Sequence, residues 1–308
     1  MRHLAPQFCW ACFLVPPVFC LLSPDTRPQG AKQLIAHRGA SAYAPEHTPA
    51  AYDLAIEQGA DFVEQDLAVT KDGVLVCIHD LTLERTTNVE EVFPDRFVED
   101  SAGGSRTRHW FVHDFTVAEL KRLDAGSWFN EKFAGARIPT FQEAIDRVRG
   151  RAGLYPELKD PAYYRERGVN PEALIVAQLR AQKLPDARTP VIVQSFDDAA
   201  LRQLAKDLPD VPRVFLVEAP GAARLATADQ VRAIAAWATG IGPHKTIVSR
   251  RPELVGWAHA AGLTVTPWTF RSADVRGFPS VRDEMAKFLY DYGVDALFTD
   301  NPDQFPRR

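Results

Sequence analysis

The chain is poor in cysteine, and the few cysteines it has are unevenly placed. Of four in 308 residues, Cys9, Cys12 and Cys20 lie in an apolar N-terminal run, and only Cys77 remains for the rest. This distribution excludes an intrachain disulfide framework in the body of the protein. We therefore interpret Cys77 as a small core residue.

The chain also lacks an excess of basic residues and a Gly-rich nucleotide turn. Its net charge is -4 and its pI is near 6.1, which argues against bulk nucleic-acid binding but leaves room for a local anion site. No Gly-rich turn of the dinucleotide-binding type follows the first predicted strand, residues 33–36. Nucleic acid is therefore not an expected ligand, and the missing turn argues against an open, doubly wound sheet.

A long uninterrupted apolar run is missing as well. Residues 8–22 are apolar but are broken by Pro16-Pro17, and a spanning helix usually needs about 20 apolar residues. The run follows Arg2 and precedes a polar, Pro-rich stretch, an order typical of an export signal. We predict a leader over residues 1–30, an exported (periplasmic or secreted) protein, no membrane span in the mature chain, and a folded domain over 31–308.

Short apolar runs alternate with amphipathic segments along that domain. The predicted strands are 33–36, 62–69, 152–157, 190–194, 213–217, 246–248, 263–268 and 296–299. The predicted helices between them are 49–58, 140–149, 170–182, 198–207, 228–238, 252–261 and 281–292. This rhythm predicts an α/β fold, a closed (β/α)8 TIM barrel whose active site lies at the carboxyl ends of the strands. An open, doubly wound sheet is the competing architecture.

Residues 82–138 interrupt the alternation with scattered aromatic residues and little regular pattern. Within them, Thr116-x-x-Glu119 is a capping box for a short helix. An irregular segment of this length is usually a lid or a small inserted subdomain, and its aromatic content disfavours a disordered loop.

The second predicted strand continues into a hairpin. The step Lys71-Asp72-Gly73 separates two apolar runs, and Asp-Gly between such runs is a strong hairpin signal. Pairing outward from a two-residue turn places residues whose numbers sum to about 143 opposite each other, so Glu64 is expected to face His79. Asp66 shares the face of Glu64 because strand side chains alternate.

Three carboxylates are expected to converge at the strand ends. Glu64, Asp66 and Glu157 offer hard oxygen ligands, which favour Mg²⁺ or Ca²⁺ over zinc. The simpler interpretation is that one or two of them pair with Arg38 or Lys159. We predict that the three together hold one divalent cation.

Two histidines and two cations accompany these carboxylates. His37 and His79 come from different strands, and a pair able to exchange roles suits general acid and base catalysis. Arg38 and Lys159 bring positive charge to the same place, which a bound phosphate would explain together with the metal.

These residues carry a resemblance to a known family. The ordered motifs His37-Arg38-Gly39, Pro45-Glu46-x-Thr48, Glu64-x-Asp66, Thr70-Lys71-Asp72-Gly73, His79-Asp80 and Glu157-x-Lys159 resemble those of the glycerophosphodiester phosphodiesterases. The resemblance spans residues 35–301 and implies a (β/α)8 barrel. The segment after His79-Asp80 is similar to the small subdomain inserted in exported members.

The resemblance also implies roles for single residues. Glu64, Asp66 and Glu157 match the family's metal ligands, His37 and His79 its acid and base, and Arg38 and Lys159 its phosphate contacts. One departure is His47, which stands where the family commonly has Asn and which we interpret as a structural residue at a helix entry. Trp268 is a candidate for packing on the substrate, although Trp at a strand end is as often plain core.

The expected activity is metal-dependent hydrolysis of a small-molecule glycerophosphodiester to sn-glycerol 3-phosphate and an alcohol such as choline or ethanolamine. One alternative is cleavage of lysophospholipids of the lysophospholipase D type, which the charged segment after residue 82 disfavours. A remote alternative from another class is a non-catalytic phosphate-binding barrel, which would be expected to lack at least one of the site residues.

Overall fold

The computed structural model describes residue 1 and residues 30–100 and 106–307. The predicted leader, with Cys9, Cys12 and Cys20, falls almost wholly outside the described residues. Met1–Ala31 and Lys32–Arg308 are separate compact units, and all that follows concerns the second. In the described part of the chain, every helix is too short or too polar to cross a bilayer.

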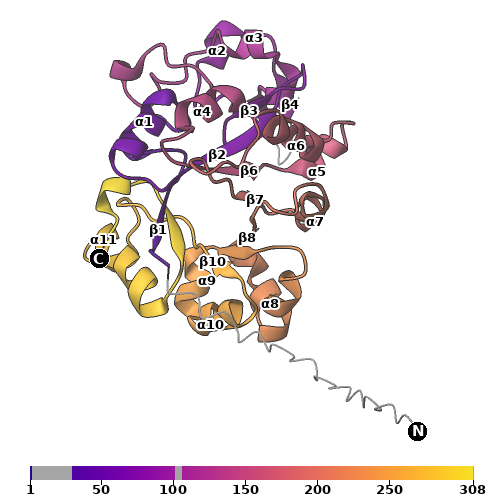
Figure 1. Cartoon of the computed structure of the whole chain (residues 1–308). Coiled ribbons are helices and arrows are strands. Elements are labelled where there is room, and N and C mark those ends of the chain that lie inside the picture. Colours follow the sequence, from indigo (N-terminus) through magenta and orange to yellow (C-terminus); the bar gives the residue numbers. More distant parts are fainter. Residues whose placement is uncertain (2–29, 101–105, 308) are drawn as a thin grey trace. The chain divides into compact units, whose positions relative to one another are not determined.

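Eight parallel strands form the main sheet of the described chain, in the order β10-β9-β8-β7-β6-β2-β1-β11 (Figure 1). They are β1 (Gln33–Ala36), β2 (Phe62–Val69), β6 (Gly153–Leu158), β7 (Val193–Ser195), β8 (Arg213–Val217), β9 (Gly240–Pro243), β10 (Thr264–Val265) and β11 (Ala296–Thr299). A ninth strand, β3 (Leu75–Cys77), pairs antiparallel with β2. The predicted parallel barrel is confirmed.

The barrel closes between β10 and β11 through a short irregular segment. The amide of Asp295 donates to the carbonyl of Val265 at 3.0 Å, and the amide of Phe298 donates to that of Pro267 at 3.1 Å. A single parallel bridge then joins Phe270 to Thr299. The first and last strands of the sheet path thus contact each other, so the open doubly wound alternative is wrong.

Helices connect successive strands on the outside of the sheet (Figure 1). They are α1 (Pro49–Glu57), α4 (Phe141–Val148), α5 (Pro161–Arg165), α6 (Pro171–Ala181), α7 (Asp198–Asp207), α8 (Ala228–Ile234), α9 (Lys245–Arg250), α10 (Glu253–Ala260) and α11 (Val281–Ala286), the last continued by a π-helix (Lys287–Tyr292). The Thr48 hydroxyl caps α1 by accepting from the amide of Ala51, and Gly59 ends it with a positive φ. The local sequence signals therefore operate as predicted.

One predicted strand is wrong. Residues 246–248 belong to helix α9, which begins after His244, and the strand in that place is β9, with the sequence Gly-Ile-Gly-Pro. A Cβ on Gly240 would lie 2.3 Å from the Thr264 hydroxyl, and one on Gly242 would lie 2.6 Å from a Leu216 methyl. Crowding from neighbouring strands thus requires glycine here, although glycine is a poor strand former by itself.

The predicted hairpin register is also wrong, by one residue. Leu67 pairs with Cys77 and Val69 with Leu75, so the numbers sum to 144. The loop has three residues, 71–73, with Gly73 at a positive φ of 77°, a common alternative to the two-residue turn. The pairing ends where the amide of Ile78 donates to the carbonyl of Asp66, so His79 lies beyond the ladder and not opposite Glu64.

Between β3 and α4 the chain forms short elements. They are α2 (Val89–Val92), β4 (Val98–Asp100), β5 (Thr107–His109) and α3 (Val117–Leu120), with 3₁₀ turns at Val112–Asp114 and Glu131–Phe133. Thr116 and Glu119 form the capping box of α3. Trp110 and Phe115 are buried in the same apolar cluster as the outer faces of the barrel strands. This segment therefore shares the main core.

The barrel interior has its own small core, and this core positions the site. Ile35, Phe62, Tyr155, Val214 and Phe298 form a cluster separate from the larger one. Because strand side chains alternate, the next inward positions on β2 and β6 are 64, 66 and 157. This cluster thus forms an apolar layer inside the barrel, and the predicted carboxylates form the next layer toward the carboxyl ends of β2 and β6.

Candidate active site

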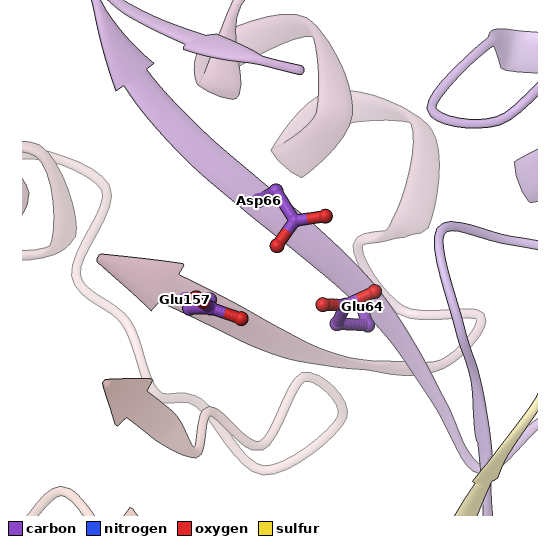
Figure 2. A group of neighbouring side chains, drawn as sticks. All are labelled: Glu64, Asp66 and Glu157. Carbon is purple, nitrogen blue, oxygen red and sulfur yellow. The ribbon is translucent and has the colours of Figure 1, made fainter. Parts of the chain in front are cut away.

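Glu64 and Asp66 from β2 and Glu157 from β6 lie together inside the barrel (Figure 2). In the parallel register Asp66 stands beside Glu157, and Glu64 is two positions earlier on the same face. One carboxylate oxygen from each residue lies within 4.8 Å of the others, and no other group of this kind occurs in the described chain. All three residues are at most 5% exposed. The structure thus brings the three predicted metal ligands together.

Burial of these three acids creates an electrostatic conflict. Desolvation, followed by the nearby charge of Asp66, raises the pKa of Glu64 well above its usual range. Burial likewise raises the pKa of Glu157 to about 8, although Lys159 opposes the shift. A divalent cation would relieve this repulsion, and buried carboxylate oxygens are the donors that Ca²⁺ and Mg²⁺ prefer. The residues present therefore fit such an ion.

Asp66 is the member of the group most firmly held in its charged form. Burial alone would raise its pKa, but Lys159, the hydrogen bond from His47 and Arg38 together keep it well below the usual range. The Arg38 Nε lies 3.2 Å from Asp66 Oδ2, and the Lys159 Nζ lies 4.0 Å from Oδ1 and 3.1 Å from Glu157 Oε1. Both predicted phosphate contacts thus border the carboxylates.

The backbone after β1 helps to build the site. Arg38 has a positive φ of 57°, and its amide donates to Glu64 Oε2 at 2.7 Å. Its guanidinium also donates to the Glu46 carboxylate at 3.2 Å, and Arg85 donates two hydrogen bonds to the same carboxylate. Burial opposes ionisation of Glu46, but the Arg85 hydrogen bonds and the charge of Arg38 lower its pKa to about 2. A fixed carboxylate thereby holds Arg38 in place.

Each predicted catalytic histidine is oriented by an aspartate. The Nδ1 of His37 donates to Asp300, which follows β11, at 2.6 Å, and that of His79 donates to Asp80 at 2.5 Å. A carboxylate only accepts, so Nε2 of each ring is the atom left for proton transfer. Arg85 bonds to Asp80 and fixes the second pair from outside. His37 is mostly buried, whereas His79 is about a third exposed.

His47 lies at the entry to α1, as expected, but it also reaches the site. Its ring is buried, its Nε2 donates to Asp66 Oδ2 at 2.9 Å, and its Nδ1 is 3.0 Å from the hydroxyl of Tyr52. The hydroxyl donates to the unprotonated nitrogen, because Nε2 carries the proton that the carboxylate accepts. His47 and Arg38 thus both contact Oδ2 of Asp66, whereas the Lys159 Nζ lies near Oδ1.

A cavity of about 210 Å³ opens over these groups. Its walls include both predicted histidines, the three acids, Arg38, Lys159 and Trp268. Trp268 is anchored by a hydrogen bond from Nε1 to the carbonyl of Gly242 and meets Phe196 edge-on at 5.6 Å. The structure thus places every predicted site residue at one cavity, although His79 reaches it by a route other than the predicted pairing.

Sequence reasoning missed several partners of these residues. Asp300, Glu46, Arg85 and Gln194 were not assigned, and His47 was not linked to Asp66. Gln194 donates to Glu64 at 3.4 Å, while its carbonyl oxygen has no hydrogen-bond partner in the described chain. The one available signal was position, since Gln194 and Asp300 both stand at the carboxyl end of a strand.

The chain is similar to proteins of one family throughout its folded unit. Residues 37–304 match the model of the glycerophosphoryl diester phosphodiesterase family. A Bacillus subtilis glycerophosphodiester phosphodiesterase is 35% identical, over 95% of this chain and 92% of its own length. A relative of the same name from Caldanaerobacter subterraneus is 33% identical, over 88% of this chain and 94% of its own length.

Solved structures give the same result. A phosphodiesterase from Oleispira antarctica, in complex with the product sn-glycerol-3-phosphate, has a TM-score of 0.69 and 31% identity, covering 89% of this chain and 95% of that one. A glycerophosphodiester phosphodiesterase from Agrobacterium tumefaciens has a TM-score of 0.65 and 30% identity, covering 89% and 98%.

Proposed function

This chain belongs to the glycerophosphodiester phosphodiesterase family, and we propose that it hydrolyses its substrate in the cavity between His37 and His79 with one divalent cation. The activity is that of a phosphoric diester hydrolase acting on glycerophosphodiesters. The observation that carries the assignment to this cavity is the meeting of three buried carboxylates with two aspartate-held histidines. The products are sn-glycerol 3-phosphate and an alcohol.

Glu64, Asp66 and Glu157 would hold the cation, either Ca²⁺ or Mg²⁺. When bound, such an ion supplies Lewis-acid polarisation of a phosphoryl oxygen and stabilises the charge that develops there. Arg38 and Lys159 border the same point and are suited to hold the remaining phosphate oxygens. The cation and these two side chains together offset the charge of both the acids and the phosphate.

The two histidines move the protons. One Nε2 takes the proton of the attacking hydroxyl as the new P–O bond forms, and the other protonates the departing alcohol oxygen as its P–O bond breaks. The nucleophile is either water or the neighbouring glycerol hydroxyl, which gives a cyclic phosphate that water then opens. Detection of a cyclic phosphate by phosphorus NMR during slow turnover distinguishes the two routes.

Replacement of the histidines tests the proposed roles. We expect His37→Ala and His79→Ala each to lower kcat on glycerophosphocholine by about 10²–10⁴-fold, the usual contribution of a general acid or base. His259→Ala is the matched control, because His259 lies on α10 and does not border the cavity. Near wild-type turnover in both cavity variants would show the assignment to be wrong.

Removal of metal tests the carboxylate site. Exhaustive chelation is expected to abolish activity, and Ca²⁺ and Mg²⁺ added back separately identify the ion that restores it. Glu157→Gln should weaken the binding of that ion, measured by calorimetry, while Glu253→Gln on α10 should not. Full activity in protein shown by elemental analysis to be metal-free would contradict the proposal.

We also propose export of the protein and removal of the leader. The support is the basic, apolar and polar order of residues 2–30 in the sequence. Expression of the full chain in a bacterial host, followed by fractionation and N-terminal sequencing, tests both points. A full-length protein found only in the cytoplasm would contradict them.

A further inference from the structure

A second cavity, of about 430 Å³, adjoins the first. The two share the walls formed by Glu157, Lys159, Phe196, Leu216 and Glu218. Because Glu157 and Lys159 are the residues proposed to hold the cation and the phosphate, the cavities meet where phosphorus would lie. A phosphodiester carries one organic arm on each side of its phosphorus. The paired cavities therefore match the two arms of the substrate.

The first cavity suits an arm that carries hydroxyl groups. The side-chain carbonyl of Gln194 is buried at this wall and accepts no hydrogen bond from the described chain. An unpaired buried acceptor is costly, and a hydroxyl donor from the ligand would satisfy it. Glycerol offers such donors, which assigns the glycerol arm to the first cavity.

The second cavity has a different character. Phe196, Leu216 and Val217 give it an apolar wall, and its cations already have partners. The guanidinium of Arg224 lies 3.2 Å from Asp198 and packs over the Phe215 ring at 4.3 Å. Lys159 is paired with Glu157 at 3.1 Å.

Besides Glu157, the second cavity is lined by two acidic residues, Glu218 and Asp160. The exposed side chains of Glu218 and Asp160 have no hydrogen bond or ion pair within residues 30–100 and 106–307. Glu218 borders both cavities, as do Glu157 and Lys159, the residues proposed to hold the cation and the phosphate. A free carboxylate there repels an anionic diester unless the arm beside it is positively charged.

We propose that the second cavity holds the alcohol arm and that Glu218 selects alcohols carrying a positively charged nitrogen, such as a quaternary or primary ammonium. The carboxylate neutralises the nitrogen, and the Phe196 ring supplies an aromatic face for it. The same ring already has the Lys159 ammonium 5.9 Å from its centre, so a cation is compatible with this surface. The inference rests on the proposed function of the first cavity.

Two diesters that differ in the charge of the alcohol test this inference. Glycerophosphocholine has a cationic arm and glycerophosphoglycerol a neutral one, and both contain the same phosphate and glycerol. We expect Glu218→Gln to lower kcat/KM for the choline ester about threefold to tenfold, mainly through KM, and to leave the glycerol ester within about twofold of wild type. Asp160→Asn should shift the ratio in the same direction but less, because Asp160 borders only the second cavity.

The control is Glu253→Gln, which removes a carboxylate from α10 outside both cavities and should change neither ester. If Glu218→Gln loses activity equally on the two esters, or on neither, the proposed role of Glu218 is wrong. The proposed function still stands in that case, provided that the wild type hydrolyses both esters. If the wild type cleaves neither ester, the proposed function fails and the inference fails with it.

Discussion

Replacement of His47 by alanine should weaken metal binding without removing a metal ligand. The imidazole donates to Asp66 Oδ2 at 2.9 Å and accepts from the Tyr52 hydroxyl at 3.0 Å, and both partners are buried. A lost outer partner of a metal ligand typically costs 10–100-fold in affinity, and we expect a loss in that range. Arg38 and Lys159 would then remain as the positively charged partners of Asp66.

The same change should lower the free energy of unfolding. A hydrogen bond to a charged group contributes about 1.5–3 kcal/mol. Loss of the hydrogen bond to the Tyr52 hydroxyl, which keeps only the Cys77 thiol as a partner, costs about a further 0.5–1.5 kcal/mol. Since the two contributions are not fully additive, we expect a loss of about 3 kcal/mol. Urea unfolding of the metal-free protein measures this quantity, and circular dichroism confirms that the variant is folded at the temperature of the binding assay.

Two further variants separate positioning from simple support of the fold. His47→Asn keeps a residue that tolerates the positive φ of 58° and an amide that can donate to Asp66, so its metal affinity should stay within a few-fold of wild type. Tyr52→Phe removes only the hydroxyl and should weaken metal binding less than His47→Ala. Affinities for Ca²⁺ and Mg²⁺ are measured by competition with a chelator. A folded His47→Ala protein that binds metal within about twofold of wild type would refute the reasoning.

Three other outcomes follow from the structure. Gly39→Ala should lower the free energy of unfolding by about 2–4 kcal/mol, because it combines a positive φ of 85° with a Cβ 2.7 Å from the Ala51 carbonyl carbon. Gly73→Ala has a similar φ but open space around the added Cβ, so it should cost about 1–2 kcal/mol. Urea unfolding measures both values. Asp300→Asn should lower kcat at least tenfold with little change in KM, because an amide does not enforce the His37 tautomer in which Nδ1 is protonated. An unchanged kcat would show that Asp300 has no such role. Glu284→Leu should destabilise the protein by about 3–5 kcal/mol, because the buried Lys245 ammonium loses its carboxylate partner at 2.9 Å and keeps only the Asp274 carbonyl. Adding Lys245→Met should recover most of this loss in thermal unfolding.

Elements with strong local signals were predicted well from the sequence. Helix α1 has its Thr48 cap, Pro49 at the first position and Gly59 at its end, and α4 has the capping box of Thr140 and Glu143. These features depend on contacts between residues a few positions apart, so the sequence displays them directly. The same holds for the alternation of strands and helices that predicts a barrel.

Errors arose where distant parts of the chain determine the local structure. The Thr-Ile-Val run at 246–248 has the composition of a strand but forms part of α9. The glycines of β9 are required by side chains of β8 and β10 that come within about 3 Å of their missing Cβ positions. In the hairpin, an Asp-Gly step is compatible with both a two-residue and a three-residue loop, and the choice shifts the register by one.

The sequence by itself determined the chemical groups of this protein: three carboxylates, two histidines and two cations in an ordered set of motifs, on a chain that alternates strand and helix. Residue type and spacing carry that information because it is local or shared with the family. Only the tertiary structure decided which partners act on those groups. His47 on Asp66, Asp300 on His37 and Glu218 between two cavities all depend on the order of the parallel strands in the sheet. In the case of Asp300 and His37, that order brings into contact residues 263 positions apart.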